Sequence, residues 1–212
     1  MTADMRSSLM RCALASFPRS GNTWVRYMIE EVTGLQSGSI YDDRVLPRGR
    51  NGIIIKTHAL DSFNYDSAVH IVRNPYDAIS SYYHWREDIA GEAGLDWDKH
   101  ALEAAAAWEA HCLHWLKAPY PVCRIRYEDL VSDATNVLVT VIEWLGQTAS
   151  RERIQEVVRQ ATIENMRKLT PLGKRFFRGA SSSGRQAYSP QVLTSLCERL
   201  HDLLLMFGYQ PL

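Results

Sequence analysis

Short apolar runs alternate along the chain with longer segments in which apolar residues recur every three to four positions. The runs at 11–16, 52–56, 68–72 and 121–126 have the length of strands, and the second run contains three consecutive isoleucines. A strand without polar alternation suits a sheet that is covered on both faces. Strands that alternate with helices form parallel sheets. The pattern therefore predicts the α/β class, with a three-layer parallel β-sheet and helices on both faces.

Helical periodicity occupies the segments between these runs. A first helix is predicted from about Asn22, with Gly34 as a plausible stop. Its buried face consists of Val25, Met28, Ile29 and Val32, which follow the i, i+3, i+4, i+7 pattern. Further helices are predicted from Pro75, over 100–117, around 138–145 and from Ser189 onwards. The last of them carries the apolar stripe Leu193, Leu196, Leu200, Leu203, Leu204 and Phe207. No repeat or linker divides the chain, so 1–212 is predicted to form a single domain.

The composition narrows the possible functions. Twenty-four basic and 24 acidic residues give a formal net charge of zero, which argues against a general nucleic-acid binder. No apolar run approaches the roughly 20 residues of a membrane span, and Asp4, Arg6 and Arg11 interrupt the stretch where a signal peptide would be apolar. The four cysteines form no CxxC pair. We therefore expect a cytoplasmic protein that binds neither nucleic acid nor a membrane.

The loop after the first strand, residues 17–24, has the features of an anion site. Gly21 would let the backbone approach a ligand closely, and the amides of the following helix start would face it. Arg19 adds a positive fork for phosphate or sulfate oxygens. The alternative is an ordinary turn with Asn22 or Thr23 as the helix N-cap. No Gly-Lys-Ser/Thr sequence follows, which counts against a kinase of the Walker type.

The second and third strands also end in reactive side chains. Lys56 and His58 would point to the same side of an extended chain and could serve as electrostatic clamp and general base. Alternatively, they are a solvated lysine and a histidine bonded to a carbonyl group. Arg73 ends the third strand, and Ser81 lies about two turns into the next helix, where both could face one ligand. The alternative pairs Arg73 with Asp77 and leaves Ser81 on the surface.

Two further groups follow the fourth strand. Glu128 and Asp129 could form a catalytic pair, but carboxylates at a helix start are the simpler interpretation. No acidic residue occurs between Asn165 and Cys197. The basic residues of that stretch are Arg167, Lys168, Lys174, Arg175, Arg178 and Arg185. With Phe176 and Phe177 among them, they favour a loop that closes over a small polyanionic ligand, rather than a solvated basic face.

Two weaker signals are better explained by packing. His111, Cys112 and His114 lie close together on a predicted helix, but only the two histidines share a face. The tryptophans Trp97, Trp108 and Trp115 could line a pocket but are more typical of a core. The sequence therefore predicts no metal site.

Taken together, the motifs resemble those of the sulfotransferases that use 3′-phosphoadenosine 5′-phosphosulfate (PAPS). The resemblance covers about 13–146 well and the C-terminal third loosely. It implies a P-loop-like fold, with PAPS as donor and adenosine 3′,5′-bisphosphate (PAP) as product. The sulfuryl group would pass in line to a hydroxyl or amine of a small-molecule acceptor, without a metal. The alternatives are a P-loop nucleotide or small-molecule kinase and a non-catalytic nucleotide-binding domain.

The resemblance also implies residue roles. The 5′-phosphosulfate would lie on Arg19, Ser20, Gly21, Asn22 and Thr23. His58 resembles the family's catalytic base, Lys56 and Arg19 would stabilise the charge of the transfer, and Trp24 would stack on adenine. The 3′-phosphate would be bound by Arg73, Ser81, Phe177, Arg178 and Gly179. Tyr127, Thr162 and Ile163 match the adenine side, with Ile163 in place of a stacking phenylalanine. The Gly-Asp-Trp that usually follows the basic loop is replaced here by 184–186.

Overall fold

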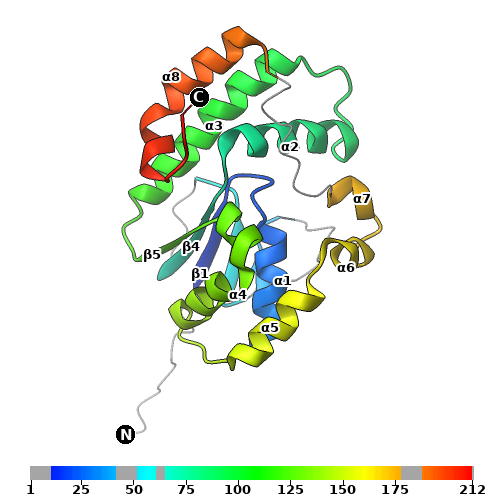
Figure 1. Cartoon of the computed structure of the whole chain (residues 1–212), viewed down its shortest axis with the longest axis vertical. Helices are drawn as coiled ribbons and strands as arrows, with labels where there is room; N and C mark the ends of the chain where they lie inside the picture. The colour runs from blue at the N-terminus through cyan, green and yellow to red at the C-terminus, as the bar shows by residue number, and fades with distance from the viewer. Residues whose placement is uncertain (1–10, 42–51, 61–64, 178–187, 212) are drawn as a thin grey trace, which may run out of the picture.

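The computed structural model of the chain describes residues 11–41, 52–60, 65–177 and 188–211. A five-stranded parallel sheet lies at its centre, in the order β2-β3-β1-β4-β5. The strands are β1 (Cys12–Ser16), β2 (Ser37–Ser39), β3 (Ile54–Thr57), β4 (Ser67–Val72) and β5 (Val122–Arg126). The four predicted strands are confirmed to within two residues at each end. The parallel sheet expected from their apolar character is confirmed as well (Figure 1).

The strand β2 was not predicted, because it carries no hydrophobic signal. Its sequence is Ser-Gly-Ser. Its position depends on a close approach of two backbone segments: a Cβ atom on Gly52 would lie 2.5 Å from the amide nitrogen of Gly38. Only a glycine lets the chain leading into β3 pass this close. The Ser37 amide and hydroxyl both donate to the Glu30 carboxylate, which ties β2 to the preceding helix.

The helices follow the predicted order, with additions. They are α1 (Asn22–Thr33), α2 (Pro75–Asp88), α3 (Trp97–Leu116), α4 (Tyr127–Trp144), α5 (Arg151–Gln160), α6 (Ile163–Lys168), α7 (Gly173–Phe176) and α8 (Pro190–Met206). Gly34 ends α1 in the left-handed conformation, as expected. Helices α5, α6 and α7 were not among the predicted elements.

Helix α4 begins earlier than the pattern around 138–145 indicated. It starts at Tyr127, directly after β5, and Asp133 interrupts it with non-helical dihedral angles. The Asp133 carboxylate accepts a hydrogen bond from the Asn136 amide at 3.1 Å. It thus acts as an internal N-cap for the second part of the helix. The apolar period identified that second part only, because the first turn is polar.

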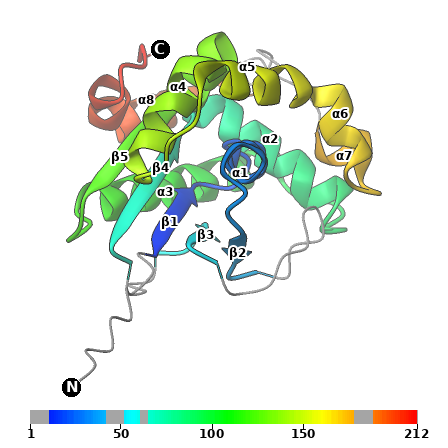
Figure 2. The same cartoon turned by 90° about the horizontal axis from the view of Figure 1, so that it is seen from below.

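Helices cover both faces of the sheet, as predicted. On one face, α1, α4 and α5 pack together against the strands (Figure 2). On the other face, the core contains residues from α2, α3 and α8, with Trp108 and Trp115 fully buried. The predicted stripe of α8 faces this core. No helix in the described part of the chain has both the length and the apolar character that a bilayer crossing needs.

The register of the sheet brings several strand ends to one place. Ala15 of β1 pairs with Thr57 of β3 on one side and with His70 of β4 on the other. All strands are parallel, so their carboxyl ends lie along the same edge. The loops that follow β1, β3 and β4 therefore meet there, as expected for ligand sites in such sheets.

Candidate active site

The loop between β1 and α1 forms the floor of the site. Gly21 precedes α1 in a left-handed conformation (φ 90°), and a Cβ atom there would lie 2.7 Å from Cδ2 of Tyr127. The side chain of Asn22 donates to the Leu14 carbonyl oxygen at 2.7 Å, beneath the loop. No side chain caps α1. The alternative in which Asn22 or Thr23 is the N-cap is therefore wrong.

His58 lies just beyond the end of β3 and is oriented by β1. Its Nδ1 lies 2.7 Å from the Ser16 carbonyl oxygen and 3.4 Å from the Ser16 hydroxyl. The ring of Tyr41 stacks on the His58 ring with centroids 5.5 Å apart, and the Tyr41 hydroxyl accepts from the His58 amide at 3.0 Å. Lys56 is buried within β3. Both Lys56 and His58 line the same cavity. His58 is bonded to a carbonyl group, as the alternative expected, but Lys56 is buried rather than solvated.

Arg73 points back across the loop after β1. Its Nη1 donates to the Arg19 carbonyl oxygen at 2.7 Å, and its guanidinium carbon lies 4.3 Å from the centre of the Tyr127 ring. The alternative of an ion pair between Arg73 and Asp77 is therefore wrong. Ser81 lines the cavity from α2.

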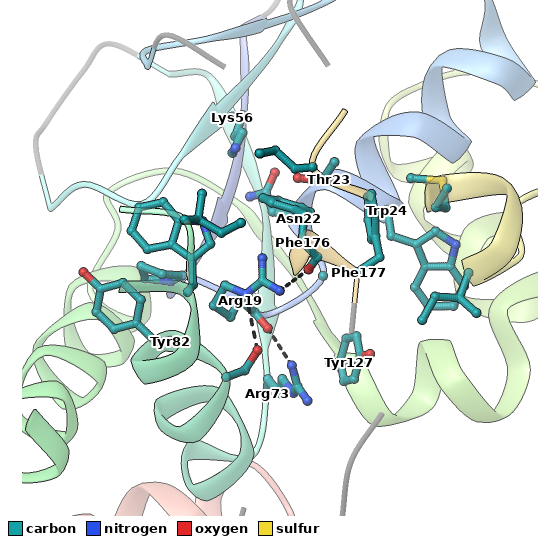
Figure 3. A pocket seen from close by; sticks show the side chains of 18 of the residues that line it. Arg19, Asn22, Thr23, Trp24, Lys56, Arg73, Tyr82, Tyr127, Phe176 and Phe177 are labelled. Atoms are coloured by element: carbon teal, nitrogen blue, oxygen red, sulfur yellow. Dashed lines mark hydrogen bonds between the residues drawn. The ribbon is translucent and has the colours of Figure 1, made fainter. Parts of the chain in front are cut away.

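Arg19 lies between these groups. Its backbone is left-handed (φ 67°). Its Nε donates to the Ser81 hydroxyl at 3.3 Å, and its Nη2 donates to the Phe176 carbonyl oxygen. Its guanidinium carbon lies 4.6 Å from the centre of the Phe176 ring. The Arg19 side chain thus contacts Ser81, which the resemblance assigns with Arg73 to the 3′-phosphate, whereas it assigns Arg19 to the phosphosulfate. Figure 3 shows Arg19 between Phe176 and Arg73.

The opposite side of the cavity is formed by α1, α4 and the α5–α6 connection. The indole Nε1 of Trp24 donates to the Ala161 carbonyl oxygen at 2.9 Å. Thr162 caps α6 by accepting a bond from the Asn165 amide. Figure 3 shows Trp24 and Tyr127 on this side of Arg19, with Tyr82 on the other. Ile163 also lines this side of the cavity.

The basic segment is partly described. Phe176 and Phe177 line the cavity, and the Phe177 carbonyl oxygen accepts from Nε of Arg167 at 2.8 Å. Arg178 and Gly179, predicted for the 3′-phosphate, lie outside the described residues, as does Arg185.

Two other groups singled out by the sequence do not line the cavity. Glu128 and Asp129 lie in the first turn of α4 and do not line the cavity, so they are helix-start carboxylates rather than a catalytic pair. His111 and Cys112 of α3 are both buried. Among the described residues, no group of three or more histidine, cysteine or acidic side chains is arranged to hold a metal.

Together these loops enclose a cavity of about 1010 Å³. This is the upper end of the size range for sites that hold one small ligand. Its cationic lining residues are Arg19, Lys56 and Arg73, and none of the described lining residues is acidic. The cavity therefore suits an anionic ligand with room beside it.

Four apolar or aromatic lining residues were not among the predicted site residues. They are Tyr41, which stacks on His58, and the residues Tyr82, Trp85 and Ile89 of α2 and its end. The Ser-Tyr-Tyr-His-Trp sequence at 81–85 was a usable signal, because Tyr82 and Trp85 are three residues apart on one side of α2. Tyr41 gave no such signal, since only the pairing of β2 with β3 brings it to His58.

Comparison with known proteins places this geometry in a family. A model of the sulfotransferase domain matches residues 54–186. A WSCD family member of Drosophila pseudoobscura pseudoobscura is 27% identical over 168 residues, covering 68% of this chain and 53% of that protein. Sulfotransferase 1A1 of Bos taurus is 23% identical over 198 residues, covering 73% and 65%. The chain thus spans about half the length of the WSCD relative.

Solved structures share the fold. Mouse sulfotransferase SULT7A1, crystallised with PAP, superposes with a TM-score of 0.72 at 19% identity, covering 92% of this chain and 85% of that one. Retinol dehydratase, in complex with androsterone and PAP, gives 0.69 at 16% identity, covering 92% and 81%. With more than half of its residues matched by the domain model, the chain belongs to the sulfotransferase domain family.

Proposed function

We propose that this protein transfers the sulfuryl group of PAPS to a hydroxyl or amine of a small acceptor, with PAP as the other product. One observation carries the proposal: Lys56 and His58 open into the same cavity as the loop after β1 and the guanidinium of Arg73. Related proteins crystallised with PAP support the choice of nucleotide.

The residues present fit a doubly phosphorylated nucleotide. The hydroxyl of Ser20 and Nε of Arg73 are buried and have no hydrogen-bond partner among the described residues. A buried donor without a partner costs free energy. Arg73 lines the cavity, so a phosphate oxygen there would satisfy its Nε, whereas Ser20 lies within the loop beside the lining residues Arg19 and Gly21. The 5′ end would lie on Ser20, Gly21, Asn22 and Thr23, and the 3′-phosphate on Arg73 and Ser81. Adenine would lie between Trp24, Tyr127, Thr162 and Ile163.

His58 is suited to remove the acceptor's proton. When Nδ1 carries a proton, it donates to the Ser16 carbonyl oxygen, and the lone pair then lies on Nε2. A fixed tautomer and a stacked ring hold the base in one orientation. When bound, PAPS supplies the sulfuryl group, and Lys56 would stabilise the charge that develops as the group leaves.

Arg19 contributes charge at the phosphate end. Its contacts with Ser81 and Phe176 direct the guanidinium to that end of the cavity. We therefore propose that Lys56 supplies the main charge stabilisation of the transfer, and that Arg19 joins Ser81 in binding the 3′-phosphate.

The acceptor would occupy the part of the cavity lined by Tyr41, Tyr82, Trp85 and Ile89. Flat apolar groups stack on aromatic rings. The described lining residues include no carboxylate that could pair with a cationic amine, which favours a neutral acceptor. We propose a flat, mostly apolar acceptor with a single hydroxyl group directed at His58.

A ligand-binding experiment tests the function. Thermal unfolding is measured with PAP, with 5′-AMP and with Mg-ATP. PAP at about 100 times its dissociation constant should add roughly 2.7 kcal/mol to the free energy of unfolding. Stabilisation by Mg-ATP but not by PAP would indicate the rival kinase. Binding of PAP without any transfer from PAPS to a panel of phenols and alcohols would indicate a non-catalytic nucleotide-binding domain.

A further inference from the structure

Two side chains bind the backbone on either side of Arg73: the buried Trp108 and the half-buried Glu128. The indole Nε1 of Trp108 donates to the Arg73 carbonyl oxygen at 3.1 Å. The next amide, that of Asn74, donates to Oε1 of Glu128 at 2.9 Å. Glu128 thus accepts a bond from the turn between β4 and α2, which lies 54 residues away in the chain. These contacts fix the peptide groups from which the Arg73 side chain starts.

Glu128 in turn is held by the C-terminal segment. The hydroxyl of Tyr209 donates to Oε2 of Glu128 at 2.6 Å and lies 3.4 Å from the Val72 carbonyl oxygen. The Tyr209 ring is buried, and the guanidinium carbon of Arg126 lies 4.5 Å from its centre. Burial and the neighbouring Glu128 both raise the pKa of Tyr209, so its hydroxyl keeps its proton at neutral pH.

The two oxygens of Glu128 therefore join three parts of the chain. Glu128 directly follows Tyr127, whose ring lies beneath the Arg73 guanidinium. Its Oε1 holds the residue that follows Arg73, and its Oε2 holds the C-terminal tyrosine. A shift of this carboxylate would move Arg73 and Tyr127 relative to each other. A displacement of about 1 Å in a binding group is enough to lower activity greatly.

We propose that Glu128 is a positioning residue that sets Arg73 and Tyr127 for the nucleotide's 3′-phosphate, and that Tyr209 orients Glu128. The proposal rests on the proposed function, because it assumes that Arg73 binds that phosphate. It makes the preference for PAP over 5′-AMP depend on a tyrosine at the far end of the chain, with no contact between that tyrosine and the nucleotide.

The test compares the dissociation constants for PAP and 5′-AMP, by calorimetry, in the wild type and in four variants of the full chain. Glu128→Ala should weaken PAP binding about tenfold or more, as expected for loss of a charge-assisted hydrogen bond, while 5′-AMP binding changes little. Tyr209→Phe should weaken PAP binding about fivefold. Glu128→Gln should restore most of the affinity, because its amide oxygen can still accept from Asn74. The double variant Glu128→Ala/Tyr209→Phe should be no worse than Glu128→Ala alone.

A matched control separates positioning from general stability. Tyr188 is also buried, and its hydroxyl donates to the Tyr76 carbonyl oxygen of α2 at 2.7 Å. Tyr188→Phe therefore removes a bond of the same kind and should lower the melting temperature, but it should leave the ratio of PAP to 5′-AMP affinity unchanged.

The outcomes distinguish the two proposals. A wild type that binds PAP no better than 5′-AMP would overturn the proposed function and this inference with it. A wild type that prefers PAP, with Tyr209→Phe keeping that preference in full, would overturn the inference alone. If Tyr188→Phe reduced the preference for PAP over 5′-AMP as much as Tyr209→Phe does, the contacts of Tyr209 and Glu128 would only stabilise the fold, and the inference would be overturned.

Discussion

At the scale of single residues, the site depends on what orients each reactive group. Lys56 projects from a strand, whereas His58 is held by the Ser16 carbonyl oxygen and the Tyr41 ring. A histidine restrained in one tautomer is prepared to accept a proton at a defined atom. The contacts of His58 involve neither Arg73 nor the loop after β1, apart from those with Ser16 at the end of β1. The effect of His58 on catalysis can therefore be measured separately from nucleotide binding.

We predict that His58→Ala lowers turnover roughly 10²–10⁴-fold, the usual effect of losing a general base. PAP affinity should stay within about twofold, because His58 would contact the acceptor and not the nucleotide. Steady-state transfer from PAPS and calorimetric titration with PAP measure the two effects. His201→Ala, an exposed position on α8, serves as the control. Turnover of His58→Ala within a few-fold of wild type would exclude the catalytic role.

The second residue-scale prediction concerns Trp24, whose indole both lines the cavity and donates to the Ala161 carbonyl oxygen. Trp24→Phe and Trp24→Ala both lose that bond, but only phenylalanine keeps a ring to stack on adenine. Trp24→Ala should lower the melting temperature more than Trp24→Phe, because the ring also packs against the buried core. The deciding measurement is PAP affinity, which should fall clearly in Trp24→Ala and little in Trp24→Phe, since base stacking contributes about 1–3 kcal/mol. Equal affinities in the two variants would show that Trp24 belongs to the core.

At the scale of elements, the junctions between strands and helices create the site. Gly21 joins β1 to α1 at a positive φ, with the Tyr127 ring of α4 directly over it. The start of α1 and the start of α4 therefore touch at a point where no side chain fits. Because of this contact, the amides of the loop after β1 and the Tyr127 ring of α4 can face the same ligand.

We predict that Gly21→Ala costs more stability than Gly91→Ala. Both glycines have positive φ, 90° and 76°, so both substitutions carry backbone strain of about 1–2 kcal/mol. A Cβ atom on Gly91 meets nothing within 4 Å, whereas one on Gly21 meets the Tyr127 ring. Gly21→Ala should also weaken PAP binding, because the ring must move. Urea unfolding and PAP titration check this, and identical results for the two variants would contradict it.

At the scale of the whole molecule, two histidines are buried between the sheet and α3. His70 of β4 and His111 of α3 have ring centroids 5.3 Å apart, and Nε of Arg124 in β5 donates to His70 at 3.3 Å. Burial, Arg124 and His114 lower the pKa of His70 to about 3. Burial, His70, His58 and His114 lower the pKa of His111 well below 6.5. Both rings are therefore neutral in the folded protein.

This arrangement predicts acid sensitivity with a definite sign. The unfolded chain takes up protons on both histidines below pH 6.5, and the folded chain does not. The stability is therefore complete above that pH and is lost as the pH falls. From about pH 7 to about pH 5.5, the free energy of unfolding should drop by about 2.5 kcal/mol, since each group contributes up to about 1.4 kcal/mol per pH unit.

Urea unfolding at the two pH values measures the drop. His70→Gln should roughly halve it, and His201→Gln, an exposed position, should leave it unchanged. A drop that is the same in His70→Gln as in wild type would show that other groups cause the acid sensitivity.

The prediction of a single domain over 1–212 and the prediction of a cytoplasmic location both remain predictions.

Much of the architecture was determined by the sequence alone. Apolar runs without polar alternation belong in a covered sheet, and helices between them force the strands to be parallel. Parallel strands end at one edge, so the loop at 17–24, Lys56, His58 and Arg73 had to meet. The local period of apolar residues carries this information, and it needs no knowledge of distant contacts.

Only the tertiary structure decided which side chains contact one another at the carboxyl-end edge of the sheet. β2 has no apolar period, so its pairing, and with it the place of Tyr41 against His58, could not be predicted. The turn of the Arg19 side chain toward Ser81 and Phe176, and the bond from Tyr209 to Glu128, join residues that are 62, 157 and 81 positions apart. Such contacts depend on how packed elements position side chains, and they leave no periodic trace in the sequence.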